Sequence, residues 1–129
     1  MIKVWNSKLK VDHCFLEAFD TYTSLLSEDE SLTDDQLLEY EDHVRYELFE
    51  NTPEIIEVNL SDLESAKKVH SSEYSEDYDL YGVVVILENS QGEQLILDGN
   101  HRINSLLKSK TKDIKIPVCK LKGYIPVSN

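Results

Sequence analysis

Residues 95–107 read LILDGNHRINSLL, and this stretch decides the predicted fold. It begins with a short apolar run, 95–97, between polar residues, as in a buried strand. Ile103, Leu106 and Leu107 then recur at the spacing i, i+3, i+4, which is the period of an α-helix. The stretch therefore predicts a strand that runs through a tight turn into a helix.

The residues between this strand and this helix favour an anion-binding turn. Asp98 and Gly99 form the turn, and Asn100 is expected to be the N-cap of the helix. A helix start leaves backbone N–H groups unpaired and carries the positive end of the helix dipole, so an anion is stabilised there. Arg102 adds a planar, permanently charged guanidinium that matches a phosphate group. The first hypothesis is therefore phosphate binding.

The elements around the D-G-N-H-R motif resemble the ParB/sulfiredoxin superfamily, over about residues 55–126. The matching order is a strand at 83–88, a turn at 89–92, a strand at 93–98, a helix at 99–110 and a last strand at 115–121. Members of the superfamily bind or process nucleotides: sulfiredoxin uses ATP, ParB binds CTP, and other members are described as nucleases. The resemblance implies an α+β fold, a small mixed sheet with flanking helices, whose turn and helix start hold phosphates.

Two departures from the motifs of known members limit which branch of the superfamily the chain can resemble in function. Asn100 stands where sulfiredoxin has its nucleophilic cysteine, and an amide nitrogen does not replace a thiolate. Ser105 stands where ParB has a second arginine, and no DNA-reading helix-turn-helix follows in the sequence. We expect neither sulfiredoxin activity nor a role in chromosome partition. The D-G-x-H-R form is nearest the free serine kinase branch.

The resemblance implies a role for each motif residue, and each residue also has a structural interpretation. Asp98 and His101 are the candidate catalytic residues: Asp98 as a magnesium ligand or a base, and His101 as a proton carrier or a hydrogen-bond donor to phosphate. Gly99, Asn100 and Arg102 are the candidate nucleotide-binding residues. Each residue also has a structural alternative. Asp98 and Gly99 could serve only the turn, His101 could tie the turn together, Asn100 could cap the helix, and Arg102 could form an ion pair with Asp98 or Glu93.

Three functions follow as hypotheses. The first is a magnesium-dependent phosphotransferase or nucleotide hydrolase that uses ATP, ADP or CTP. Its magnesium ion needs a second carboxylate, for which Glu57 and Glu64 are the nearest candidates. The second is an acidic inhibitor or immunity-type module, as phages and plasmids encode, with a vestigial site. The third is a ParB-like nuclease.

The chain organisation predicts a single domain over residues 1–129, with a helical addition at 1–53 and the ParB/sulfiredoxin-like core at 54–129. A first amphipathic helix begins at Asp12, and a second follows a capping-box sequence at 33–36 and ends at 51–53. Elements added to a common fold often determine which partner or substrate the protein binds.

The charge is strongly acidic and unevenly distributed. The formal net charge is −12; residues 1–89 carry six Lys/Arg against 22 Asp/Glu, whereas residues 90–129 carry seven against three. A negative field of this size repels a nucleic-acid backbone, which argues against direct nucleic-acid binding and weakens the nuclease hypothesis. Two explanations of the acidity stay open: solubility, and a surface on the N-terminal helices that imitates nucleic acid or binds a basic protein.

Further local patterns complete the predictions. No apolar run is long enough to span a bilayer and the first residues do not form a secretory signal, so a cytoplasmic protein is expected. Cys14 and Cys119 are expected to be buried free thiols. A helix is predicted from Ser61 to about residue 70, and the loop 71–81, rich in tyrosine and acid, is either a lid or a connector. Pro117 predicts that the last strand is an edge strand or bulged.

Overall fold

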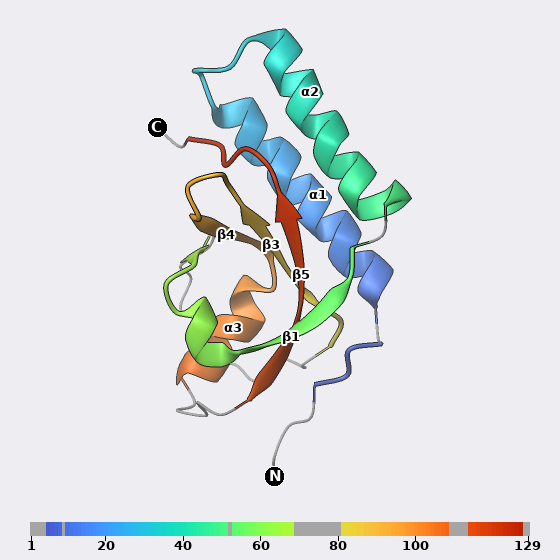
Figure 1. The fold of residues 1–129 in the computed structure, drawn as a ribbon, viewed down its shortest axis with the longest axis vertical. Coiled ribbons are helices and arrows are strands. Elements are labelled where there is room, and N and C mark those ends of the chain that lie inside the picture. The colour runs from blue at the N-terminus through green and yellow to red at the C-terminus, as the bar shows by residue number, and fades with distance from the viewer. Residues whose placement is uncertain (1–4, 9, 52, 69–80, 109–113, 128–129) are drawn as a thin grey trace.

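The computed structural model describes residues 5–8, 10–51, 53–68, 81–108 and 114–127 (Figure 1). Two helices come first, and the third helix lies between the last two strands along the chain. Along the chain the elements are α1 (Val11–Glu28), α2 (Asp34–Arg45), β1 (Ile55–Asn59), β2 (Lys67–Lys68), β3 (Val84–Glu88), β4 (Gln94–Asp98), α3 (Asn100–Lys108) and β5 (Lys115–Lys122). A π-helical turn, Tyr46–Glu50, continues α2, and a 3-10 turn, Leu60–Leu63, follows β1. The predicted α+β class is confirmed.

Within the described part of the chain, five strands form one mixed sheet in the order β1-β5-β3-β4-β2. The pairs β1–β5 and β3–β4 are antiparallel, whereas β5–β3 and β4–β2 are parallel. The β3–β4 hairpin closes through Asn89, whose side-chain oxygen accepts the N–H groups of Gln91 and Glu93 at 3.1 and 2.9 Å. In this order β4 lies between β3 and β2, and α3 begins directly after its end.

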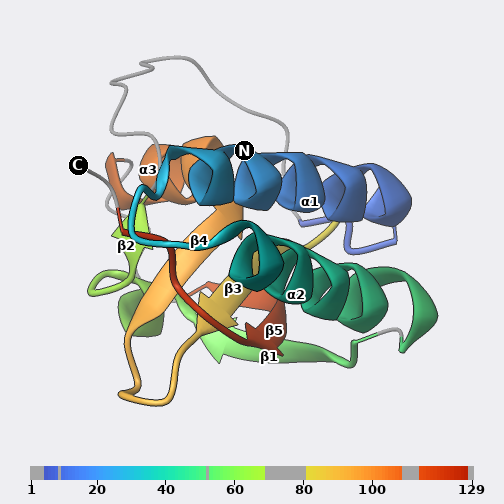
Figure 2. The ribbon, with the colours of Figure 1, turned by 90° about the horizontal axis from the view of Figure 1, so that it is seen from above.

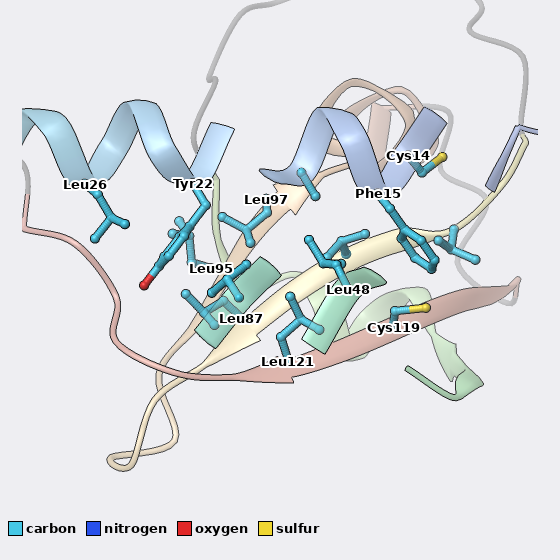
Figure 3. Close-up of a cluster of buried hydrophobic side chains, with 14 residues drawn as sticks. Cys14, Phe15, Tyr22, Leu26, Leu48, Leu87, Leu95, Leu97, Cys119 and Leu121 are labelled. Carbon is cyan, nitrogen blue, oxygen red and sulfur yellow. The ribbon is translucent and has the colours of Figure 1, made fainter. Parts of the chain in front are cut away.

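Both faces of the sheet are covered, which explains the nearly continuous apolar run in β3. Val85 and Leu87 pack with α1 and α2, whereas Val84 and Ile86 pack with α3 on the other face. Figure 1 shows α1 and α2 side by side on one side of the sheet and α3 on the other. In Figure 3, side chains of α1 such as Tyr22 point onto those of β3, β4 and β5.

The predicted helical hairpin is present as α1 and α2, which run side by side in both Figure 1 and Figure 2. The capping box at the start of α2 is formed: Gln36 N–H donates to Thr33 Oγ1 at 3.2 Å, and Thr33 N–H donates to Gln36 Oε1 at 3.0 Å. Cys14 and Cys119 are buried free thiols, as predicted. In the part of the chain that the structure describes, no helix is both long and apolar enough to cross a membrane.

The C-terminal segment is held against the helix pair by the buried carboxylate of Asp29. Tyr124 Oη and the N–H of Val127 donate to its Oδ2 at 2.5 and 2.9 Å. Hydrogen bonds from the Ser31 and Tyr124 side chains, and then from the Val127 N–H, lower the pKa of Asp29. Tyr40 stacks on the Tyr124 ring with centroids 4.5 Å apart, and this contact joins the chain end to α2.

Two local predictions are wrong. The helix expected from Ser61 is a single 3-10 turn, Leu60–Leu63, capped by Asn59, and the strand β2 follows it. The last strand, β5, lies inside the sheet between β1 and β3 rather than at an edge, and its register with β1 is unbroken through Pro117, so it is not bulged there either. Pro117 is tolerated there because β3 meets β5 only from Val118 onward, so the missing N–H falls before the parallel ladder begins. Of the predicted loop 71–81, all but the last residue lies outside the described residues.

Candidate functional site

The turn between β4 and α3 depends on Gly99, which has φ +106°. This backbone conformation disfavours L side chains. A Cβ at this position would also lie 2.9 Å from Cγ2 of Val84 on the neighbouring strand. Gly99 thus permits both the turn and the close packing of the helix start on the sheet.

Asn100 fixes the direction in which α3 leaves the sheet. The side chain is buried, and its Nδ2 donates to the carbonyl of Ile96 at 3.1 Å. The helix begins with Asn100 itself, so the N-cap prediction is wrong by one position and Gly99 precedes the helix. The asparagine side chain ties the first helical residue back to β4.

Arg102 is 5% exposed and lies inside the protein. Its Nη2 donates to Asp98 Oδ2 at 2.9 Å, and its Nη1 donates to the carbonyl of Tyr81. The guanidinium also lies over the Tyr81 ring at 4.7 Å and over the Trp5 ring at 5.5 Å. The predicted alternative of an ion pair with Asp98 is therefore present, but in a buried setting. A phosphate would have to compete with these partners for the guanidinium.

Asp98 is the carboxylate at the centre of this arrangement. Burial raises its pKa, although the positive charge of Arg102 and a hydrogen bond with Cys14 act in the opposite direction. Burial likewise raises the pKa of the Cys14 thiol, whose sulfur lies 3.8 Å from Nη2 of Arg102. The side chain of Asp98 is 20% exposed, so it remains reachable from outside.

A pocket of about 310 Å³ opens at this turn. It brings all five predicted site residues together with polar side chains of α1. The lining comprises His13, Glu17, Thr21, Tyr81, Leu97, Asp98, Gly99, Asn100, His101 and Arg102. The predicted site residues thus share one pocket, at the end of β4 and the start of α3.

The pocket residues from α1 were not predicted. His13, Glu17 and Thr21 follow one another at intervals of four, which places them on one face of the helix. This spacing was the signal available in the sequence, but nothing in the sequence shows that this face lies over a turn some 80 residues later. His13 Nε2 lies 3.7 Å from Glu17 Oε1, and both side chains are 54% exposed.

The second carboxylate of the pocket is Glu17. The candidates Glu57 and Glu64 do not line the pocket, so that guess is wrong. The charge of Glu17 contributes to the raised pKa of Asp98, which indicates that the two carboxylates interact. Among the described residues, no group of three or more His, Cys, Asp or Glu side chains is arranged to hold a metal ion. Two carboxylates still fit Mg²⁺, which commonly takes one or two of them together with substrate phosphates and water.

Comparisons of the chain with protein-family models, with curated proteins and with solved structures found no match.

Proposed function

We propose that this protein binds a nucleotide with its phosphates at the start of α3, as the resemblance to the ParB/sulfiredoxin superfamily implies. The observation that carries the proposal is the pocket of about 310 Å³ whose lining contains the whole D-G-N-H-R motif. A pocket at a helix start combines space for a ligand with backbone N–H groups and a favourable dipole.

In this proposal the phosphates contact the first turn of α3 rather than Arg102. A helix start presents backbone N–H groups and the positive end of the helix dipole to an anion, and the positive φ of Gly99 lets the backbone come close to the ligand. His101 and His13 line the same pocket and can donate hydrogen bonds to phosphate oxygens. Arg102 acts as a positioning residue, because it fixes the orientation of Asp98 and leaves a positive charge beneath the pocket.

Asp98 and Glu17 would hold a magnesium ion that accompanies the nucleotide. Such an ion neutralises phosphate charge and polarises the phosphoryl group. Without a cation, the two carboxylates would repel a phosphate, so binding should depend on magnesium. His101 lines the pocket beside Asp98, and its imidazole could carry a proton to or from an attacking hydroxyl or water. The reaction class is therefore phosphotransfer or nucleotide hydrolysis.

The test is thermal unfolding with ATP, ADP or CTP, each with and without magnesium. Binding to the folded state raises the melting temperature by mass action. We expect one nucleotide to raise it only when magnesium is present, and the rise to shrink in Glu17→Gln and His101→Ala. Glu39→Gln, an exposed change on α2, is the matched control and should keep the full rise. The absence of a rise with all three nucleotides would overturn the proposal.

A second candidate function, binding of a basic protein by the N-terminal helices, is favoured by the charges that these helices expose. Asp34, Asp35 and Glu39 are exposed on α2, and the arginine of that helix, Arg45, is already paired with Glu41 and Asp42 at 2.8 and 2.6 Å. Salt-sensitive binding of a basic protein that is lost when these acids are replaced by amides would support it.

A further inference from the structure

The strand β1 forms one edge of the sheet, because β5 is its neighbour on one side and the sheet order ends with it. Figure 2 shows β1 along the lower rim of the fold. Among the described residues, no strand pairs with its outer side. An edge strand of this kind can accept a further strand through its backbone groups.

The register shows which residues of β1 present their backbone to the outer side. In an antiparallel pair, residues alternate between exchanging two hydrogen bonds with the partner and pointing their N–H and C=O groups away. Glu57 lies opposite Pro117, which has no N–H and cannot exchange two bonds. By this alternation Glu57, Ile55 and Asn59 point outward, whereas Ile56 and Val58 bond to β5.

An independent hydrogen bond agrees with this alternation. The N–H of Asn59 donates to Oδ2 of Asp62 at 3.3 Å, so it points away from β5 as expected. Because this bond occupies the outward N–H of Asn59, that group is not open to a further strand at the C-terminal end of β1. Ile55 and Glu57 are therefore the two residues whose N–H and C=O groups face an incoming strand.

The side chains of β1 suit an added strand with apolar residues. Ile55 is 45% exposed and Ile56 is 36% exposed, and as neighbours in a strand they lie on opposite faces of the sheet. Val58, on the same face as Ile56, packs partly against the core. An added strand in which basic and apolar residues alternate would place its apolar side chains beside Ile56 and Val58 on one face, and its basic side chains beside Ile55 and Glu57 on the other.

The charge around this edge selects the kind of partner. Glu50, Glu54 and Glu57 are all exposed along or just before β1. A second copy of this chain would bring the same carboxylates together, in a protein whose net charge is −12, so pairing between copies is disfavoured. We propose that the outer edge of β1 binds an extended segment of a partner protein in which lysine or arginine alternates with apolar residues, as an added strand.

The first test uses the synthetic peptide acetyl-Lys-Val-Lys-Ile-Lys-Val-Lys-amide and amide hydrogen exchange read by NMR. In the free protein, the amides of Ile55 and Glu57 should exchange fast, while those of Ile56 and Val58 are protected. Saturating peptide should slow exchange at Ile55 and Glu57 at least tenfold, and the analogue with glutamate in place of lysine should not. Unchanged exchange at both outward amides would overturn the proposal, as would protection that rises with protein concentration without peptide, which would identify a second copy as the occupant.

The second test uses variants and peptide affinity. Glu57→Pro removes the outward N–H and keeps the bonds to β5, so it should weaken binding at least tenfold while the protein stays folded. Glu57→Lys should weaken binding far more than Glu39→Lys, which makes the same charge change at an exposed position on α2. Equal losses in the two lysine variants would mean that overall charge alone attracts the peptide, and would overturn the proposal even if Glu57→Pro does not fold.

Discussion

Nη2 of Arg102 lies 2.9 Å from Oδ2 of Asp98, and this partly buried ion pair joins the first turn of α3 to the end of β4. The same guanidinium reaches the carbonyl of Tyr81, just before β3. The Arg102 side chain thus links the segments that form the pocket. Although its guanidinium was predicted to bind phosphate, it stabilises contacts inside the protein.

Arg102→Ala should destabilise the protein by about 1–3 kcal/mol, because it leaves the partly buried carboxylate of Asp98 without its charged partner. Arg45→Ala is the matched control: its ion pairs with Asp42 and Glu41 are exposed and should contribute at most about 1 kcal/mol. Urea unfolding of both variants measures the difference. Similar losses in the two variants would show that the pair with Asp98 is not a support.

Gly99→Ala should destabilise the protein more than Gly92→Ala. Both glycines have positive φ, 106° and 82°, so alanine is strained at each position. A Cβ at Gly99 would meet Val84 at 2.9 Å, whereas a Cβ at Gly92 would meet no described residue within 4 Å apart from its chain neighbours. We expect about 1–3 kcal/mol of additional loss at Gly99 from this overpacking. Equal melting temperatures for the two variants would contradict the close approach of the turn to the sheet.

Asp29 should make the folded state lose stability in acid. Its hydrogen bonds with Ser31, Tyr124 and Val127 lower its pKa below the ordinary value of 3.8. The unfolded state therefore binds protons more readily than the folded state, and stability falls as pH drops from about 5 through the folded pKa. Asp29→Asn should be less stable than the natural protein at pH 7, and this difference should shrink by pH 3. A difference that does not change with pH would contradict this role of the carboxylate.

Asp98 should act in the opposite direction, because burial raises its pKa in the folded state. Protonation then favours folding, so this residue contributes more stability as pH falls through its folded pKa toward 3.8. Asp98→Asn should remove that gain, and comparing urea unfolding at pH 7 and pH 4 measures it. If Asp98→Asn and the natural protein respond identically to pH, the carboxyl group is not desolvated as described.

Hydrophobic periodicity was sufficient to predict the order from β3 to β5, since each of these elements is short and bounded by polar residues. The two helices of the hairpin were predicted from the same kind of periodicity, and the capping-box sequence at Thr33 marked the start of α2. The pattern at Ser61 misled the prediction, because a capping-box sequence fits a single 3-10 turn as well as a longer helix. The interior position of Pro117 could not be predicted, because it depends on where β3 begins to pair with β5.

The site was predicted only in part. The motif residues are contiguous, so they were expected to lie together and do line one pocket. Glu17 and His13 reach that pocket by tertiary packing of α1, which one sequence does not reveal. The burial of Arg102 was missed for the same reason, because Tyr81 and Cys14 approach it from distant segments.

The most direct test of the central claim, phosphate binding at the start of α3, is an NMR titration of the amide signals with ATP, ADP and CTP in the presence of magnesium. We predict saturable shifts that are largest at Asn100, His101 and Arg102, whose backbone forms the first turn of α3. These shifts should need magnesium. Shifts with no nucleotide, or shifts confined to residues far from this turn, would contradict the account.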